Sequence, residues 1–442
     1  MPVKCSVVAA KMAQKASRLL NKNGSNIPGV VARKIDKNIL HKLSKRAEKI
    51  IFISGTNGKT TTSQIVGHIF AANGLRTIHN SEGSNMITGI TTAFIDNESV
   101  LLSKKADVAV IEIDEGSIAR VTKEVQPDIM VFTNFFRDQL DRFGEIDTLV
   151  EKIGSVIKET NSKLVLNADD PFVSRLGRIG MEAEYFGLGT KSFKFEQHNM
   201  IESTFCPECG KALEYDHIHY GQLGHYHCGC GFNRVKPKYE INEVNIDIKK
   251  GLTLNLNEET FSLPILGSYN SINALAAISV CLEYGLTPEQ IQNALNTFNV
   301  ENGRMESFEN RDSNVILNLA KNPAGVNVSL SESNYNNESR QYLFALNDLA
   351  YDGRDISWIW DADFEKINES LTERVICSGI RAADMAVRIK YAGIPEEKIE
   401  IIEDIDSAIN ELTSHNINSY VVPNYTVLEP TRKALVKRLK NS

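Results

Sequence analysis

The chain has 442 residues, of which 42% are hydrophobic and 24% charged, and its formal net charge is −7. This length predicts two or more domains, and the composition is that of a folded globular protein rather than a disordered or membrane-spanning one. The negative charge argues against a general nucleic-acid-binding protein, because such binding needs an excess of Lys and Arg.

The first 35 residues contain seven lysines and arginines and no acidic residue. Apolar residues recur among them at helical spacing, which predicts a basic helix with one apolar face. Two interpretations fit: the helix packs on the body of the protein, or it lies on an anionic membrane surface. Lysines interrupt the apolar run that a signal peptide would need, so we expect a cytoplasmic protein, with the inner face of the membrane as an alternative location.

A phosphate-binding motif follows a short apolar run at residues 50–53, which predicts a buried strand. The run leads into SGTNGKTTT (54–62), and a helical pattern continues to Gly74. A strand, a glycine-containing loop and a helix in this order direct backbone amides at a phosphate. Lys59 would reach the β and γ phosphates, and the Thr60 hydroxyl would bind Mg²⁺. The nucleotide contacts expected from the loop are Gly55, Thr56, Asn57, Gly58, Lys59, Thr60 and Thr61.

Two further apolar runs predict strands. Residues 108–111 end at Glu112, and residues 129–133 lead into Asn134 and the sequence DQLDR (138–142).

Four of the seven cysteines lie within a short segment, at Cys206, Cys209, Cys228 and Cys230. Two closely spaced cysteine pairs in a cytoplasmic chain predict a metal site rather than disulfides. Four thiolates complete a tetrahedral Zn²⁺ shell with no open position, so we expect a structural zinc in a ribbon inserted at residues 202–236. The neighbouring histidines are expected at the surface of the ribbon; they are His217, His219, His225 and His227.

The loop GTNGKTT resembles that of the Mur ligase and folylpolyglutamate synthase superfamily. Other motifs follow in the order found in that family, including TN before DQLDR, GSYNSIN (267–273) and GRME (303–306). The resemblance implies ATP-dependent activation of a carboxylate as an acyl phosphate, with Mg²⁺ held by Thr60 and Glu112. The sequence departs from the family pattern at Gln139, which replaces the histidine of a second magnesium site.

The later motifs complete the nucleotide site that the resemblance implies. Asn270 and Asn273 would contact the adenine, since each side-chain amide offers both a donor and an acceptor. Arg304 would clamp the γ-phosphate and stabilise the charge that develops during transfer. The catalytic residues expected in this part of the chain are therefore Lys59, Glu112 and Arg304.

The last third alternates strand and helix patterns, which predicts a Rossmann-like α/β domain. The expected strands lie at 315–317, 342–345, 375–378 and 420–422. The predicted architecture is α/β, with a P-loop Mur ligase central domain, an inserted four-cysteine zinc ribbon and the C-terminal domain. Its expected bounds are 1–48 for the basic N-terminal segment, 49–306 for the ATP-binding domain and 307–442 for the C-terminal domain.

Only 54 residues precede Gly55, too few for the nucleotide-sugar domain of the peptide-adding Mur ligases. The ribbon and the segments 318–325, 347–355 and 423–426 resemble the family of ligase subunits that amidate lipid II. That resemblance implies conversion of the D-isoglutamate α-carboxylate of the stem peptide to D-isoglutamine. Two rival classes are a glutamate-adding ligase of folylpolyglutamate synthase type and a zinc-ribbon ATPase that binds nucleic acid.

The ammonia for such a reaction would come from a GatD-like glutaminase subunit in a heterodimer, because this chain has no glutaminase nucleophile with a partner histidine. Asp355 ends an acid-rich run, and two interpretations of it remain open. It either orients a catalytic histidine of the partner or belongs to a turn at Asp352 and Gly353.

Overall fold

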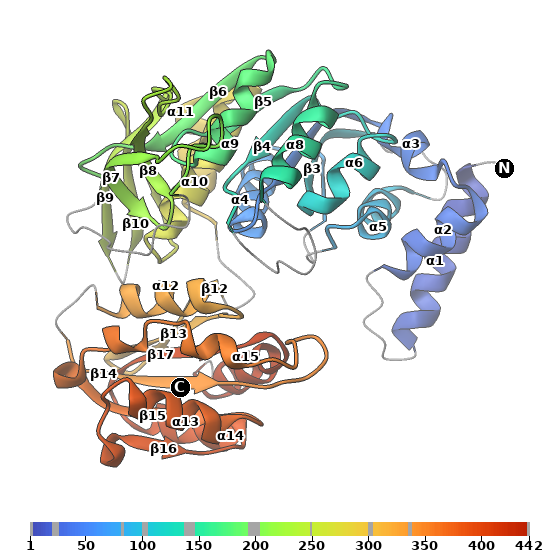
Figure 1. Ribbon diagram of the computed structural model, residues 1–442. Helices are drawn as coiled ribbons and strands as arrows, with labels where there is room; N and C mark the ends of the chain where they lie inside the picture. The colour runs from blue at the N-terminus through green and yellow to red at the C-terminus, as the bar shows by residue number, and fades with distance from the viewer. Residues whose placement is uncertain are drawn as a thin grey trace. The chain divides into compact units, whose positions relative to one another are not determined.

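The chain folds into two compact units, each built around its own β-sheet (Figure 1). The first unit comprises Met1–Ile246, Leu252–Leu263 and Tyr269–Phe298, and the second comprises Asp247–Gly251, Pro264–Ser268 and Asn299–Ser442. The computed structural model describes residues 3–19, 26–80, 84–99, 105–136, 146–192, 204–247, 250–298, 304–334 and 338–439. The three domain boundaries expected from the sequence stay a prediction.

The sheet of the first unit has nine strands within the described residues, in the order β11-β10-β9-β6-β5-β4-β1-β3-β2. Its strands are β1 (Ala47–Ser54), β2 (Thr77–His79), β3 (Ala106–Glu112), β4 (Ile129–Phe132), β5 (Lys163–Asn167), β6 (Ala183–Leu188), β9 (Tyr239–Asp247), β10 (Gly251–Leu256) and β11 (Glu259–Leu263). From β2 to β9 the recorded pairings are parallel, and β10 and β11 are antiparallel. Parallel strands are buried on both faces, which explains the unbroken apolar runs of β1 and β3.

The strand order explains how distant motifs meet. β1 pairs with β3 on one side and β4 on the other, with Ile53 opposite Glu112 and Ser54 opposite Phe132. Because these three strands are parallel, the segments that follow them emerge at one edge of the sheet. The phosphate-binding loop therefore lies between the ends of β3 and β4.

The helices of the first unit connect and cover its strands. They are α1 (Val3–Leu19), α2 (Ile27–Ile35), α3 (Ile39–Ser44), α4 (Lys59–Ala72), α5 (Ile87–Asn97), α6 (Ile118–Val121), α8 (Ile146–Ile157), α9 (Pro171–Leu176), α10 (Tyr269–Tyr284) and α11 (Pro288–Leu295). The basic helix α1 packs on α2, and α2 packs on α5. Val7 and Ala10 are fully buried in the same core cluster as the sheet, so α1 packs on the body of the protein.

The cysteine-rich insert lies between β6 and β9. It contains an antiparallel hairpin of β7 (Glu214–Tyr220) and β8 (Leu223–His227). A small apolar cluster supports it, and two of the four cysteines take part in that cluster.

The second unit has a six-stranded sheet within the described residues, in the order β12-β13-β17-β14-β15-β16. Its strands are β12 (Arg304–Asn310), β13 (Ser313–Asn318), β14 (Arg340–Ala345), β15 (Thr372–Ser378), β16 (Ile399–Ile401) and β17 (Asn418–Pro423). Its helices are α12 (Pro323–Ser333), α13 (Ala382–Tyr391), α14 (Ile405–Ser414) and α15 (Tyr425–Leu439). The strands pair in parallel except β12 with β13, so the Rossmann-like α/β pattern expected from the sequence is confirmed.

Candidate nucleotide site and cysteine cluster

The phosphate-binding loop joins β1 to α4, and Gly58 is the residue directly before the helix. Gly55 has a φ of +133° and Gly58 a φ of +83°, and residues other than glycine rarely adopt these angles. A Cβ on Gly55 would stand 2.2 Å from Thr133 Oγ1, and a Cβ on Gly58 would stand 2.0 Å from Asn273 Oδ1. Backbone conformation and close packing therefore both require glycine at these two positions.

Thr133 and Asn134, which follow β4, hold the loop from its side. The Asn57 amide donates to Asn134 Oδ1 at 2.9 Å, and Asn134 Nδ2 donates back to the Asn57 carbonyl at 3.0 Å. Thr133 Oγ1 donates to the same carbonyl at 2.7 Å, and the Thr56 amide donates to the Asn134 carbonyl at 2.8 Å. The TN motif thus fixes the loop backbone, a role that the sequence pattern had not indicated.

The Lys59 ammonium lies against the loop. It donates to the Gly55 carbonyl, to the Thr56 carbonyl at 3.1 Å and to Glu115 Oε2 at 3.1 Å. Glu115 begins the short 3-10 helix η1 (Glu115–Ser117), and its side chain is 7% exposed. Burial raises the pKa of the Glu115 carboxyl, although the Lys59 ammonium opposes this rise. No role for Glu115 was expected from the sequence.

Glu112, at the end of β3, is held by two asparagines from the segment after β2. The Glu112 amide donates to Asn80 Oδ1 at 2.8 Å, and Asn80 Nδ2 donates to the Glu112 carbonyl at 2.8 Å. Asn85 Nδ2 donates to Glu112 Oε1 at 3.3 Å, whereas Oε2 is buried and has no hydrogen-bond partner. Since an unpartnered buried carboxylate oxygen is unfavourable, Glu112 fits the role of a cation ligand.

Asn270 and Asn273 lie near the start of α10 and are 1% and 3% exposed. Asn273 Nδ2 donates to Asn270 Oδ1 at 2.9 Å, and the Asn273 side chain packs against Gly58. The structure therefore brings Asn273 of the GSYNSIN motif against the phosphate-binding loop. Contact with adenine stays a prediction.

The remaining residues singled out in the sequence have different surroundings. Thr60 and Thr61 are in the first turn of α4, where Thr60 is half-buried and Thr61 is buried. Arg304 belongs to the second unit, where it begins β12 and pairs with Asn318. Gln139, with the rest of the DQLDR sequence, lies outside the described residues.

Asp355 is exposed and also belongs to the second unit. Its Oδ1 accepts a hydrogen bond from the Ser357 amide at 2.8 Å, and this bond lowers the pKa of the Asp355 carboxyl. Asp352, by contrast, accepts bonds from the Leu349 and Thr426 amides and so fixes the turn. Asp355 is therefore not needed to close that turn.

The four cysteines predicted to bind metal come together. Cys206 Sγ lies 3.7 Å from Cys230 Sγ, Cys209 Sγ lies 3.6 Å from Cys228 Sγ, and all four sulfurs are within 4.8 Å of one another. A disulfide requires sulfurs about 2 Å apart. Sulfurs around a tetrahedral Zn²⁺ with bonds of about 2.3 Å stand roughly 3.8 Å apart, so the arrangement is compatible with zinc.

Two histidines of the hairpin contact β6. His219 is 2% exposed, so the expectation that it lies at the surface was wrong. The Nε2 atoms of His219 and His225 lie 3.1 Å and 2.7 Å from the Leu188 carbonyl oxygen. Arg234 donates to the same carbonyl and to Asp169 Oδ1. These bonds tie the insert to β6, and the guanidinium beside Asp169 disfavours a cation there.

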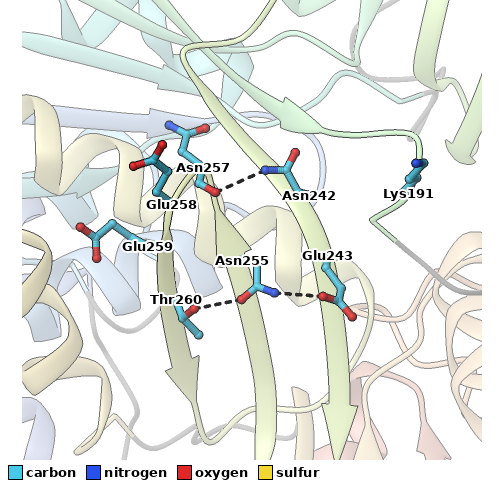
Figure 2. Close-up of a pocket in the computed structure, with 8 residues that line it drawn as sticks. All are labelled: Lys191, Asn242, Glu243, Asn255, Asn257, Glu258, Glu259 and Thr260. Atoms are coloured by element: carbon cyan, nitrogen blue, oxygen red, sulfur yellow. Dashed lines mark hydrogen bonds between the residues drawn. The ribbon is translucent and has the colours of Figure 1, made fainter.

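A polar surface pocket of about 550 Å³ lies over β9, β10 and β11 (Figure 2). Its lining residues are Lys191, Asn242, Glu243, Asn255, Asn257, Glu258, Glu259 and Thr260. Three carboxylates against one ammonium disfavour a phosphate ligand, and none of the predicted site residues lines the pocket.

Comparison with known proteins matches both parts of the chain. Residues 53–281 match the Mur ligase middle domain family, and residues 319–428 match the MurT ligase C-terminal family. The chain is 49% identical over 426 residues to the lipid II isoglutaminyl synthase (glutamine-hydrolyzing) subunit MurT of Staphylococcus aureus (strain COL), with 96% of each chain covered. The subunit of the same name from Streptococcus pneumoniae (strain ATCC BAA-255 / R6) is 34% identical over 94% of this chain and 93% of its own.

Solved structures share the fold at lower identity. A pseudomurein peptide ligase type C from Methanothermus fervidus has a TM-score of 0.67 at 24% identity and covers 88% of this chain and 78% of its own. A MurF ligase from Thermotoga maritima in complex with ADP has a TM-score of 0.65 at 14% identity, with 93% and 84% covered. The Mur ligase fold expected from the motifs is confirmed. With two near-full-length relatives of one kind and a match to the MurT ligase C-terminal family, the chain belongs to the Mur ligase family, in its branch of MurT subunits of lipid II isoglutaminyl synthase.

Proposed function

We propose that the chain is the ligase subunit that amidates lipid II in peptidoglycan synthesis. It converts the α-carboxylate of D-isoglutamate in the stem peptide to the amide of D-isoglutamine. The observation that carries this proposal is the 49% identity, over 96% of both chains, to a relative named for that activity. The phosphate-binding loop, held in shape by Thr133 and Asn134, supports ATP as the second substrate.

The reaction has two steps. A carboxylate oxygen of the substrate attacks the γ-phosphorus of ATP, the bond from that phosphorus to the bridging oxygen breaks, and ADP leaves. Ammonia then attacks the acyl carbon and loses a proton, and inorganic phosphate leaves with the former carboxylate oxygen. The loop amides from Gly55 to Thr61 bind the phosphates, and Lys59 neutralises charge on the β and γ groups.

Mg²⁺ is the metal that Mur ligases use with ATP, and Thr60 and Glu112 would hold it here. When bound, it neutralises phosphate charge next to the transferred group. The unpartnered Oε2 of Glu112 supports this assignment, because it leaves one buried carboxylate oxygen ready for a cation.

Three residues complete the proposed nucleotide site. Asn270 and Asn273 contact the adenine through side-chain amides. The position of Asn273 against Gly58, and its hydrogen bond to Asn270, support a place beside the nucleotide. Arg304 binds the γ-phosphate during transfer. The order of these motifs in the chain supports the roles.

The cysteine cluster binds a structural Zn²⁺ through Cys206, Cys209, Cys228 and Cys230. Sulfur separations of 3.6 and 3.7 Å support this, and four thiolates leave no position open for catalysis.

A glutaminase subunit of GatD type supplies the ammonia as partner in a heterodimer. The word glutamine-hydrolyzing in the names of the relatives supports this, as do exposed apolar residues near Asp355, including Tyr351 at 86% and Trp360 at 52% exposure. Asp355 orients a histidine of the partner. In the reconstituted pair, Asp355→Asn should abolish glutamine-dependent amidation and spare ammonium-dependent amidation, whereas Asp361→Asn, also exposed, should spare both. Unchanged use of glutamine would remove the role.

The chain works next to the membrane that carries its lipid-linked substrate. No helix among the described residues has the length and apolarity to cross a bilayer. A peripheral contact is supported by α1, where Lys4, Met12 and Lys15 are exposed. Sedimentation with anionic vesicles should fall in a K4E/K15E variant, and equal sedimentation of variant and parent would exclude this contact.

An isotope experiment tests the acyl phosphate directly. Lipid II carrying ¹⁸O in the D-isoglutamate α-carboxylate should release phosphate that contains one ¹⁸O atom for each amide formed. Lys59→Ala should lower amide formation and labelled phosphate together. Amide formation with unlabelled phosphate would overturn the acyl phosphate step.

A further inference from the structure

The ion pair between Lys59 and Glu115 is placed where phosphates are expected to bind. The Lys59 ammonium lies 3.1 Å from Glu115 Oε2, and the two side chains are 13% and 7% exposed. An ammonium has three donor hydrogens, and here its three acceptors are the Gly55 carbonyl, the Thr56 carbonyl and Glu115. To bind the β or γ phosphate, Lys59 must therefore give up one of these contacts.

Of the three acceptors, Glu115 is the one that a phosphate would replace. The two carbonyls belong to the loop that encloses Lys59, whereas the carboxylate is a separate anion that competes with phosphate for the same ammonium. Once Lys59 turns to the phosphates, Glu115 becomes a buried carboxylate without its cation, beside a polyphosphate of the same sign. Such a charge is strongly unfavourable unless another cation takes the place of the first.

Backbone hydrogen bonds hold the segment around Glu115 in place. The Ile113 amide donates to the Ile53 carbonyl at 3.0 Å, the Asp114 amide to the Asn85 carbonyl at 3.2 Å, and the Ser117 amide to the Asp114 carbonyl at 2.8 Å. The Asn85 side chain also donates a hydrogen bond to Glu112, so Asn85 contacts both Glu112 and Asp114. The segment that carries Glu115 is thereby fixed to β1 and to the support of Glu112.

We propose that Glu115 is a positioning residue that holds Lys59 and makes nucleotide binding depend on Mg²⁺. Lys59 exchanges Glu115 for a phosphate of the nucleotide favourably only when a metal at Glu112 and Thr60 supplies the positive charge that Glu115 loses. The buried, unpartnered Oε2 of Glu112 is the second observation behind this assignment, because it provides a ligand for that cation in the same supported segment. The inference rests on the proposed nucleotide site.

The test is the Mg²⁺ dependence of AMP-PNP binding, measured by titration calorimetry on the full chain. The dissociation constant is measured in EDTA and in excess Mg²⁺ for the parent, Glu115→Gln and Glu115→Asp. Glu115→Gln should bind metal-free AMP-PNP roughly tenfold more tightly than the parent and gain correspondingly less from Mg²⁺. Glu115→Asp keeps the charge and should keep most of the Mg²⁺ dependence.

Asp114→Asn is the matched control, because it removes a neighbouring charge whose carboxylate makes no recorded contact with Lys59. Its Mg²⁺ dependence should equal that of the parent. The inference is overturned if Glu115→Gln keeps the dependence of the parent, or if Asp114→Asn loses as much. If the parent binds no AMP-PNP even with Mg²⁺, the proposed nucleotide site itself is wrong.

Discussion

At the scale of single residues, asparagine side chains hold the phosphate-binding loop and Glu112 of the proposed nucleotide site. Asn134 fixes Asn57 of the loop, whereas Asn80 and Asn85 hold Glu112. An amide side chain both donates and accepts, so one asparagine can satisfy two backbone groups at once. The chain thereby has its phosphate-binding loop shaped by protein contacts.

Asn134→Ala should weaken binding of ATP with Mg²⁺ and leave the fold intact. It removes two hydrogen bonds to Asn57, each worth about 0.5–1.5 kcal/mol, so we expect a dissociation constant roughly 5- to 150-fold higher. Titration calorimetry measures it. Asn242→Ala, at the exposed polar pocket of Figure 2, is the control and should bind like the parent. Equal affinity of both variants would show that Asn134 does not shape the loop.

At the scale of elements, Glu283 anchors α10 to the sheet. Lys163 of β5 and Lys238 beside β9 lie 2.8 Å and 2.6 Å from its carboxylate oxygens. Burial alone would raise the pKa of Glu283, but hydrogen bonds from Lys163, Lys238 and Tyr239 outweigh it and lower the pKa to about 2. An unfolded glutamate has a pKa of about 4.3. The stabilisation is therefore complete above that pH and is lost as the pH falls towards 2.

Glu283→Gln should lower the thermal unfolding midpoint at pH 7, by an amount that corresponds to roughly 2 kcal/mol. The difference from the parent should shrink below about pH 4 and be nearly gone near pH 2. Calorimetric scans across this range measure both midpoints. A difference that stays constant with pH would show that the ionised carboxylate is not the stabilising form.

The proposed zinc site should stabilise the cysteine insert, whose apolar cluster is small. Cys206→Ser should reduce bound zinc, measured by mass spectrometry, from one ion per chain to near none and make the insert sensitive to protease. Cys5→Ser changes an exposed cysteine of α1 and should retain the metal. Full zinc content in the Cys206 variant would contradict the four-thiolate site.

At the scale of the whole molecule, contiguous motifs could be predicted from the sequence and long-range partners could not. GTNGKTT, Glu112 and the four cysteines carry their chemistry in local spacing. The pairing of Lys59 with Glu115 and the support of Glu112 by Asn80 depend on which strands lie side by side. The surface position predicted for His219 was wrong for the same reason. Its burial comes from packing on β6, which the alternation of residues in the hairpin does not show.

The residues with proposed roles are divided between the two units. The phosphate-binding loop, Glu112, Asn270 and Asn273 belong to the first unit, whereas Arg304 and Asp355 belong to the second. A ligase of this kind requires ammonia, and its proposed source is another subunit. The chain alone should therefore carry the ligase chemistry but not the hydrolysis of glutamine.

The most direct test is amidation of lipid II by the purified chain with ATP, first with an ammonium salt and then with glutamine. We expect D-isoglutamine to form with ammonium and not with glutamine, and activity with glutamine to appear when the glutaminase subunit is added. No amidation with ammonium, together with ATP hydrolysis driven by free glutamate, would contradict the account and favour a glutamate-adding ligase.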